Sequence, residues 1–155
     1  MSLLLNSTKI INEWTDYNNH MNLSFYILVF DKAAEKILSQ FKMGEEAAKK
    51  TKRSTMVVET HTTYNNEVKE GEDVEVFLSY FNHDKKRLHY KLEMYEKSKN
   101  ILSATTEVLA LYINLNLRKV AEFEKEKLII MDKFIEENNQ KFKFDNLQFS
   151  NKLKK

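Results

Sequence analysis

The chain has 155 residues, enough for one domain with a substantial core. Its net charge of +2 is spread along the chain, which gives no support for nucleic acid as a partner. The absence of cysteine excludes thiol catalysis, disulfides and cysteine-based metal sites. No apolar run reaches the ~18 residues of a membrane span, and residues 1–5 lack the features of a signal peptide, so we expect a cytoplasmic protein without a membrane partner.

The first two predicted elements are a strand and a long helix. Residues 8–13 are predicted to form a short strand. Residues 23–42 are predicted to form a helix, because their apolar side chains recur at the i, i+3, i+4 spacing of a single stripe. Asn22 or one of two earlier asparagines can cap its start, and Gly44 marks its end.

Beyond the helix the apolar pattern becomes alternating. Strands are predicted over residues 54–64, 73–81, 87–96 and 101–113, with a hairpin loop at 82–86. In the first of these strands one face would carry Thr55, Val57, Glu59, His61 and Thr63. In the third, the core face would carry Leu88, Tyr90, Leu92 and Met94, and the outward face His89, Lys91, Glu93 and Glu96.

A second helix is predicted from residue 121 to about 139, again with one apolar stripe. The Lys-rich residues 141–155 show no pattern, so we expect them to be loose or docked on a partner. The chain therefore divides into one domain, residues 1–140, and a tail. A sheet and a single-striped helix can cover each other's apolar faces, which predicts an α+β fold with one core. The faces left over favour self-association, most simply as a two-fold dimer.

The polar turn before the long helix is the strongest chemical signal. It brings the Asp16 carboxylate, the His20 imidazole and the Asn22 amide next to a helix amino end. Unpaired N–H groups and partial positive charge at such an end stabilise a developing anion. The combination points to acyl-transfer chemistry. Taken singly, these residue types are common in turns and caps, so a purely structural turn is the alternative.

The turn also carries a family resemblance. The pattern Asp16-x-x-x-His20-x-Asn22-x-x-x-Tyr26 resembles the signature of the 4-hydroxybenzoyl-CoA thioesterase-like superfamily. Residues 13–22, EWTDYNNHMN, are similar to the EWIDYNGHMN segment of the betainyl-CoA thioesterases, and residues 83–89 resemble a second segment of that group. Asn19 stands where that group usually has Gly, and Asn can also adopt a left-handed backbone.

The resemblance implies a hotdog fold, in which a five-stranded antiparallel sheet wraps a long central helix and protomers associate, here with an extra C-terminal helix. It also implies hydrolysis of an acyl-CoA thioester, without a cofactor other than the coenzyme A of the substrate. Asp16 would act as nucleophile or as general base. Backbone N–H groups near Asn22 and Leu23 would stabilise the oxyanion. His20 would orient Asp16 or bind the leaving thiolate, and Asn22 would hold the turn or the carbonyl.

The acyl group would be short, or would carry a quaternary ammonium as in betainyl-CoA. Rings near the turn can bind such a cation by cation–π attraction, and the candidates are Trp14, Tyr17, Phe25 and Tyr64. Tyr26 belongs to the motif and is a further candidate substrate contact, although it lies on the apolar stripe. For each ring, core packing is the alternative.

Other charged residues offer weaker hypotheses. Glu59 and His61 share one strand face and are candidates to reach the turn across a dimer interface, unless that face is only solvated. Glu107 is a candidate site residue or an ion-pair partner. The loop residues Lys85, Lys86 and Arg87, flanked by His83 and His89, can bind the phosphates of CoA or form a solvated hairpin tip. The four histidines show no metal-ligand spacing, so we expect no metal.

The preferred interpretation is a homodimeric or homotetrameric acyl-CoA thioesterase that binds neither nucleic acid nor membrane. Two alternatives remain open. The same fold can act on acyl-carrier-protein thioesters or as a hydratase, or it can bind acyl-CoA without catalysis. Thiol release by the wild type and by Asp16→Asn separates these interpretations.

Overall fold

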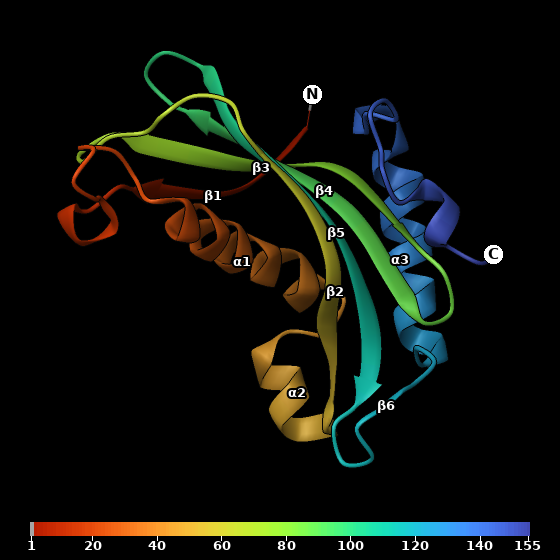
Figure 1. Cartoon of the computed structure of the whole chain (residues 1–155). Helices are drawn as coiled ribbons and strands as arrows, with labels where there is room; N and C mark the ends of the chain where they lie inside the picture. The colour runs from red at the N-terminus through yellow and green to blue at the C-terminus, as the bar shows by residue number, and fades with distance from the viewer. Residues whose placement is uncertain (1) are drawn as a thin grey trace.

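The computed structural model describes residues 2–155 (Figure 1). Five long strands, one short strand and three α-helices form its framework. In chain order these are β1 Leu3–Lys9, α1 Leu23–Gln40, α2 Glu45–Thr51, β2 Arg53–Tyr64, β3 Asp73–His83, β4 Arg87–Glu96, β5 Ile101–Asn114, β6 Lys119–Val120 and α3 Lys125–Asn138. Single 3-10 turns lie at Asn12–Trp14, Asn139–Lys141 and Ser150–Lys152.

The strands form one antiparallel sheet in the order β1-β3-β4-β5-β2, and β6 pairs with the end of β5. The sheet curls around α1, while α3 and the residues after it lie on the other side of the strands (Figure 1). The predicted α+β arrangement, with a five-stranded antiparallel sheet, a central helix and an added C-terminal helix, is therefore confirmed.

The central helix α1 begins and packs as its sequence predicts. Asn22 is its N-cap and accepts a hydrogen bond from the Ser24 N–H at 3.1 Å. Its apolar stripe is buried against the sheet, through Tyr26, Val29, Phe30, Ala33, Ala34 and Ile37. The helix ends at Gln40, two residues before the predicted end, because Lys42 adopts a left-handed backbone with φ 61°.

The first predicted strand is misplaced. The strand lies at Leu3–Lys9, where it pairs with β3, and residues 12–14 form a 3-10 turn. Ile10 is buried and its N–H donates to the Glu72 carbonyl, which ends the strand and directs the chain toward the polar turn. Pairing with β3, a partner more than sixty residues away, decides this strand more than local pattern does.

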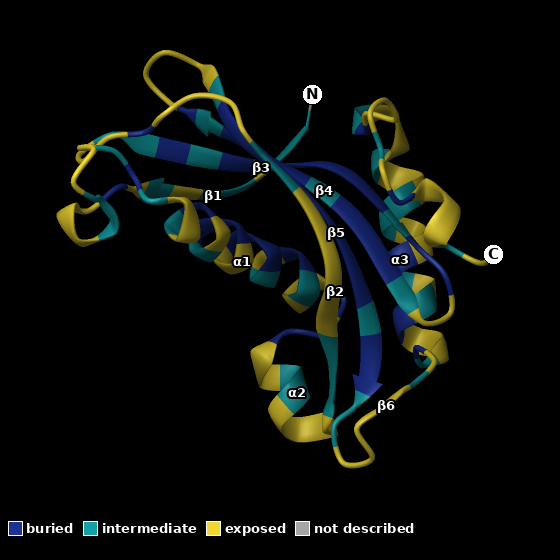
Figure 2. Ribbon diagram, viewed as in Figure 1, coloured by how far each residue is buried: buried dark blue, intermediate teal, exposed yellow. Residues whose placement is uncertain are grey.

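The strand β2 forms an edge of the sheet and is largely exposed (Figure 2). Its predicted face assignment is only partly correct. A β-bulge lies between Val57 and Glu59, and it shifts the alternation by one residue. Val57 therefore lies on the α1 side together with Thr60, while Glu59 and His61 lie on the opposite side in register with Leu109 and Glu107.

The C-terminal segment, defined as residues 142–154, packs against the chain's own sheet. The expectation that it is loose or docked on a partner is corrected by three contacts. The Lys143 ammonium lies 2.6 Å from Glu93, the Lys143 N–H donates to the Ser79 carbonyl, and the N–H groups of Gln148 and Phe149 donate to Glu107. The outward face of β4 is therefore covered, and its His89 and Glu93 side chains are buried rather than solvated.

No helix within residues 2–155 is both long enough and apolar enough to cross a membrane.

Candidate active site

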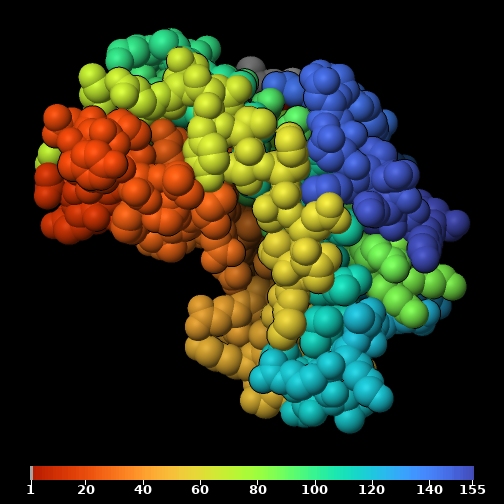
Figure 3. Space-filling view, in the orientation of Figure 1, coloured from red at the N-terminus to blue at the C-terminus, as the bar shows by residue number. Residues whose placement is uncertain are grey.

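A cavity of about 520 Å³ lies at the amino end of α1. Its walls come from three parts of the chain: the polar turn, the first turn of α1, and the end of β2 with the loop that follows it. In Figure 3 the orange turn and helix start lie beside this yellow-green loop. The lining residues are Asp16, Tyr17, Asn18, His20, Met21, Asn22, Leu23, Tyr26, Tyr64, Asn65, Asn66 and Glu67.

Backbone hydrogen bonds hold the polar turn in one shape. The Asn19 N–H donates to the Asp16 carbonyl at 3.0 Å, and the Asp16 N–H donates to the His20 carbonyl at 3.2 Å. Asn19 itself has φ 61°, the left-handed conformation that Gly adopts most easily and Asn tolerates. The Met21 N–H donates to the Val68 carbonyl at 2.7 Å, which ties the turn to the loop on the other side of the cavity.

Asp16 is held as an ionised carboxylate. Its Oδ1 accepts the Asn18 N–H at 2.8 Å and its Oδ2 accepts the Asn22 side-chain amide at 3.2 Å. The hydrogen bond from Asn18 is the main cause that lowers the pKa of Asp16, and the Asn22 amide and the nearby His20 act in the same direction. Each carboxylate oxygen accepts one of these bonds and keeps a second lone pair free. Asp16 is therefore charged near neutral pH.

The Asn22 side chain makes hydrogen bonds in two directions at the start of α1. Its Oδ1 caps the helix through Ser24, and its Nδ2 orients Asp16. Its own N–H donates to the Trp14 carbonyl at 2.9 Å and is not free to bind a ligand. Within residues 2–155 the Leu23 N–H has no acceptor, so it is a free donor at the helix start, in the cavity that Asp16 also lines.

His20 lines the cavity, and one of its two ring nitrogens is already hydrogen-bonded. Its Nδ1 lies 3.1 Å from the Met21 carbonyl oxygen, which accepts the Nδ1 proton. This contact fixes the ring orientation and leaves Nε2 without a partner in the described part of the chain.

The candidate aromatic residues separate into two groups. Tyr17, Tyr26 and Tyr64 line the cavity, and the rings of Tyr26 and Tyr64 meet edge to face with centroids 5.3 Å apart. Trp14 instead stacks on Phe25 at 5.9 Å, and the Lys32 ammonium lies 5.6 Å from the indole centroid. Neither Trp14 nor Phe25 is among the residues that line this cavity.

Glu59 and His61 do not approach Asp16 within one protomer. His61 lines a separate polar cavity of about 290 Å³ between the sheet and the C-terminal segment. Both side chains are exposed and lie on the sheet face away from α1.

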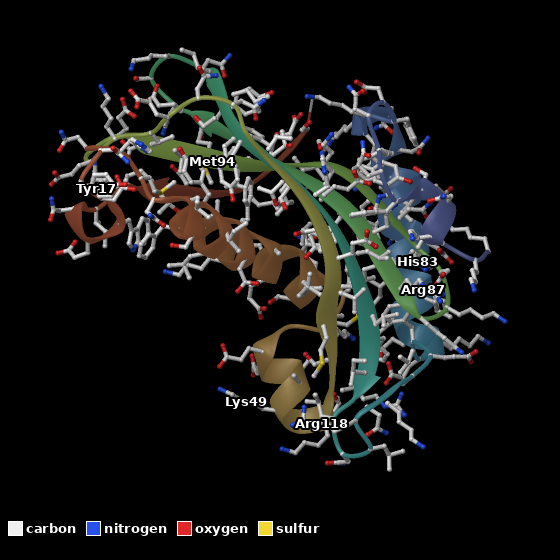
Figure 4. All side chains as sticks on the ribbon, in the orientation of Figure 1. Tyr17, Lys49, His83, Arg87, Met94 and Arg118 are labelled. Atoms are coloured by element: carbon white, nitrogen blue, oxygen red, sulfur yellow. The ribbon has the colours of Figure 1, made fainter. Side chains whose placement is uncertain are left out.

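The basic hairpin loop lies at the opposite end of the protomer from the polar turn, as the labels of Arg87 and Tyr17 show (Figure 4). Lys85, Lys86 and Arg87 line a cavity of about 330 Å³. Arg87 pairs with the buried Asp84 at 3.0 Å. Burial acts to raise the pKa of Asp84, but hydrogen bonds from the Lys154 and Lys86 N–H groups and from Arg87 outweigh it and lower that pKa.

Two histidines near the loop have structural partners. His83 Nε2 lies 2.6 Å from Asp132 of α3. His89, predicted to face outward, is fully buried, and its Nε2 lies 2.6 Å from the equally buried Glu107. The C-terminal segment causes this burial, and burial lowers the pKa of His89 although Glu107 acts to raise it. His89 is therefore neutral and donates its Nε2 proton to Glu107.

Sequence reasoning missed one acidic residue in the active-site cavity. Glu67, from the loop after β2, faces the same space as Asp16. No sequence motif surrounds Glu67. Its position near the polar turn follows from the folded structure, where the Met21–Val68 hydrogen bond joins the loop to the turn. Among residues 2–155, no three His, Cys, Asp or Glu side chains lie together as metal ligands.

Comparison with known proteins agrees with this fold. The sequence model of the family described as the thioesterase-like superfamily matches residues 12–134 of this chain. A betainyl-CoA thioesterase from Pseudomonas aeruginosa is 33% identical over 121 residues, covering 78% of this chain and 76% of the relative.

Solved structures give the same fold. A hypothetical protein from Staphylococcus aureus, determined in complex with CoA, superposes with a TM-score of 0.80 at 22% identity and covers 96% of this chain and 91% of that one. A DHNA-CoA thioesterase from the same species superposes with a TM-score of 0.78 at 17% identity, covering 87% of this chain and 92% of that one.

The chain belongs to the thioesterase-like superfamily and has its hotdog fold. The prediction of a thioesterase-class enzyme, made from the turn motif and the strand order, is confirmed by the family match.

Proposed function

We propose that the protein hydrolyses short acyl-CoA thioesters, with acyl groups of the betainyl kind as the preferred substrates. One observation carries the proposal: an ionised carboxylate, Asp16, and a free backbone donor, the Leu23 N–H, face one cavity at a helix amino end. The resemblance to a betainyl-CoA thioesterase and the CoA-bound structural neighbour support the substrate class.

The geometry suggests a division of tasks. Asp16 attacks the thioester carbonyl or removes a proton from an attacking water. The Leu23 N–H donates to the carbonyl oxygen as it becomes an anion, with the partial positive charge of α1 behind it. Asn22 orients Asp16, and His20, whose Nδ1 proton goes to the Met21 carbonyl, donates to the departing sulfur through Nε2 when both of its ring nitrogens carry a proton.

Nucleophile and base are separable by isotope. In a single turnover in H₂¹⁸O, an activated water places ¹⁸O in the acid released. Direct attack by Asp16 expels the CoA thiolate and forms a mixed anhydride, and attack of water at the Asp16 carboxyl carbon then leaves ¹⁸O on the enzyme and places an oxygen of the enzyme in the first acid released. The two roles therefore predict opposite labelling of the first product.

A second copy of the chain completes the proposal. The edge strand β2 exposes Met56, Val57 and Val58, and α1 exposes Leu23 and Ile27. Val57 and Ile27 line one apolar cavity between β2 and α1. A long apolar edge strand is normally covered, so we propose a two-fold dimer through β2. Phosphates of CoA bound at one turn would then be met by Lys85, Lys86 and Arg87 of another copy, because these residues are too far away in their own protomer.

The test is thiol release from a panel of acyl-CoAs. Asp16→Asn can still accept the Asn18 N–H through its amide oxygen but loses the acceptor for the Asn22 amide and the negative charge, so kcat falls about 10²–10⁴-fold while the backbone hydrogen bonds of the turn keep the change in Tm small. Asp145→Asn, an exposed aspartate of the C-terminal segment, is the matched control and retains activity. Wild-type protein that binds acyl-CoA without turnover, or that acts only on carrier-protein thioesters, contradicts the proposal.

A further inference from the structure

The charge inside the active-site cavity is one-sided. Of the residues described as lining it, two are carboxylates, Asp16 and Glu67, three are tyrosines, and none is lysine or arginine. The basic residues Lys85, Lys86 and Arg87 line a different cavity at the other end of the protomer. An anionic acyl group is therefore disfavoured at this position, and a cationic one is favoured.

Glu67 is free to serve such a group. Its only ion pair within residues 2–155 is with Lys69, at 3.6 Å, and both side chains are more than half exposed. An exposed pair of this kind contributes little and leaves the carboxylate able to change partner. Glu67 and the buried Tyr26 line the same cavity. Burial raises the pKa of Tyr26, a hydrogen bond from the Val68 backbone opposes that rise, and the Glu67 charge adds to it.

The aromatic wall fits the same ligand. Tyr26 is buried and Tyr64 is half-exposed, and their rings meet edge to face beside Glu67. The electron-rich face of a tyrosine attracts an organic cation, and more so where water is excluded. A carboxylate with two adjacent tyrosines is a suitable site for a trimethylammonium group.

The substrate's own chemistry identifies this cavity. In a betainyl thioester only one methylene separates the carbonyl carbon from the charged nitrogen. A carbonyl placed at Asp16 therefore puts the cation in the same cavity. A competing carboxylate, Asp31, lines an apolar cavity along α1, but it lies eight residues beyond Leu23, about 12 Å along the helix axis.

We propose that Glu67 selects acyl groups that carry a permanent positive charge, with Tyr26 and Tyr64 as the walls that hold the cation. This inference rests on the proposed thioesterase function and assigns its selectivity to one residue. Glu67 is a specificity-determining residue and takes no part in bond cleavage.

The experiment compares two substrates of the same shape. Betainyl-CoA and 3,3-dimethylbutyryl-CoA differ in having nitrogen or carbon at the branch, so the ratio of their kcat/KM values isolates the charge. Glu67→Gln lowers the ratio about fivefold, the effect of one unit charge at about 4 Å in water, and Glu67→Lys lowers it about 25-fold. Glu70→Gln makes the same charge change on the same exposed loop, outside the cavity, and leaves the ratio unchanged.

The outcomes are distinct. A ratio that stays within twofold of wild type in both Glu67 variants overturns the inference while leaving the thioesterase function intact. A ratio that falls in Asp31→Asn and not in Glu67→Gln also overturns it and places the cation along α1. If the wild type hydrolyses no acyl-CoA, the proposed function fails, and the inference fails with it.

Discussion

The buried carboxylate of Glu107 allows a quantitative test of what holds the C-terminal segment. Its oxygens accept three donors: the N–H groups of Gln148 and Phe149 at 2.7 and 2.9 Å, and His89 Nε2 at 2.6 Å. Glu107→Leu leaves these donors without an acceptor in a site that excludes water. A buried donor left unpaired costs about 1–3 kcal/mol. The segment can also lift off and expose Phe149, which limits the total, so we expect a loss of about 3–5 kcal/mol in the free energy of unfolding.

Two further variants separate the carboxylate's charge from its geometry. Glu107→Gln keeps an acceptor oxygen and removes the charge, so we expect a smaller loss, about 1–2 kcal/mol. Glu136→Leu, on the exposed face of α3, is the control, with an expected change within about 0.5 kcal/mol.

The assay is urea unfolding, combined with hydrogen exchange at the amides of Gln148 and Phe149. In Glu107→Leu those amides exchange much faster than in the wild type, because they lose their acceptor. A loss below about 1 kcal/mol, or unchanged exchange at both amides, would refute the reasoning that Glu107 holds the segment.

The remaining predictions concern pH and assembly. Because burial holds the pKa of His89 below its ordinary value, the unfolded chain binds more protons than the folded one as pH falls through about 6.5. The free energy of unfolding therefore decreases on acidification from pH 8 to 5, and in His89→Asn the decrease is smaller; equal slopes in urea titrations count against this assignment. Val57→Glu places a charge on the exposed edge strand β2, so it converts the proposed dimer to a monomer in sedimentation experiments. A monomeric wild type contradicts the dimer.

The parts of the fold that sequence predicts well are those with one face in the core. The stripe of α1 reflects burial against the sheet, and in β4 the apolar residues that face α1 alternate with polar ones, so local spacing is sufficient to predict both elements. The position of β1 depends on a distant partner, β3, and the bulge at Val58 shifts the register of β2 by one residue. Neither feature leaves a periodic signal.

In the candidate site, too, residues that are close in sequence are predictable, and residues brought in by the fold are not. Asp16, His20 and Asn22 are close in sequence, and the ten-residue segment 13–22 is enough to bring them together. Glu67 reaches the cavity only through the fold, from a loop some fifty residues later. His89 was placed on the correct sheet face but as a solvated residue, because nothing in β4 indicates that residues 142–154 return to cover it.

The distance in sequence between Glu107 and the N–H groups that donate to it has a consequence for synthesis on the ribosome. Gln148 is 41 residues later, so its N–H is made roughly 2–8 s after Glu107 at ordinary translation rates. During that interval the outer side of the young sheet is uncovered. A charged carboxylate on this uncovered face stays hydrated, which opposes aggregation with other nascent chains. An apolar residue at position 107 would favour such aggregation.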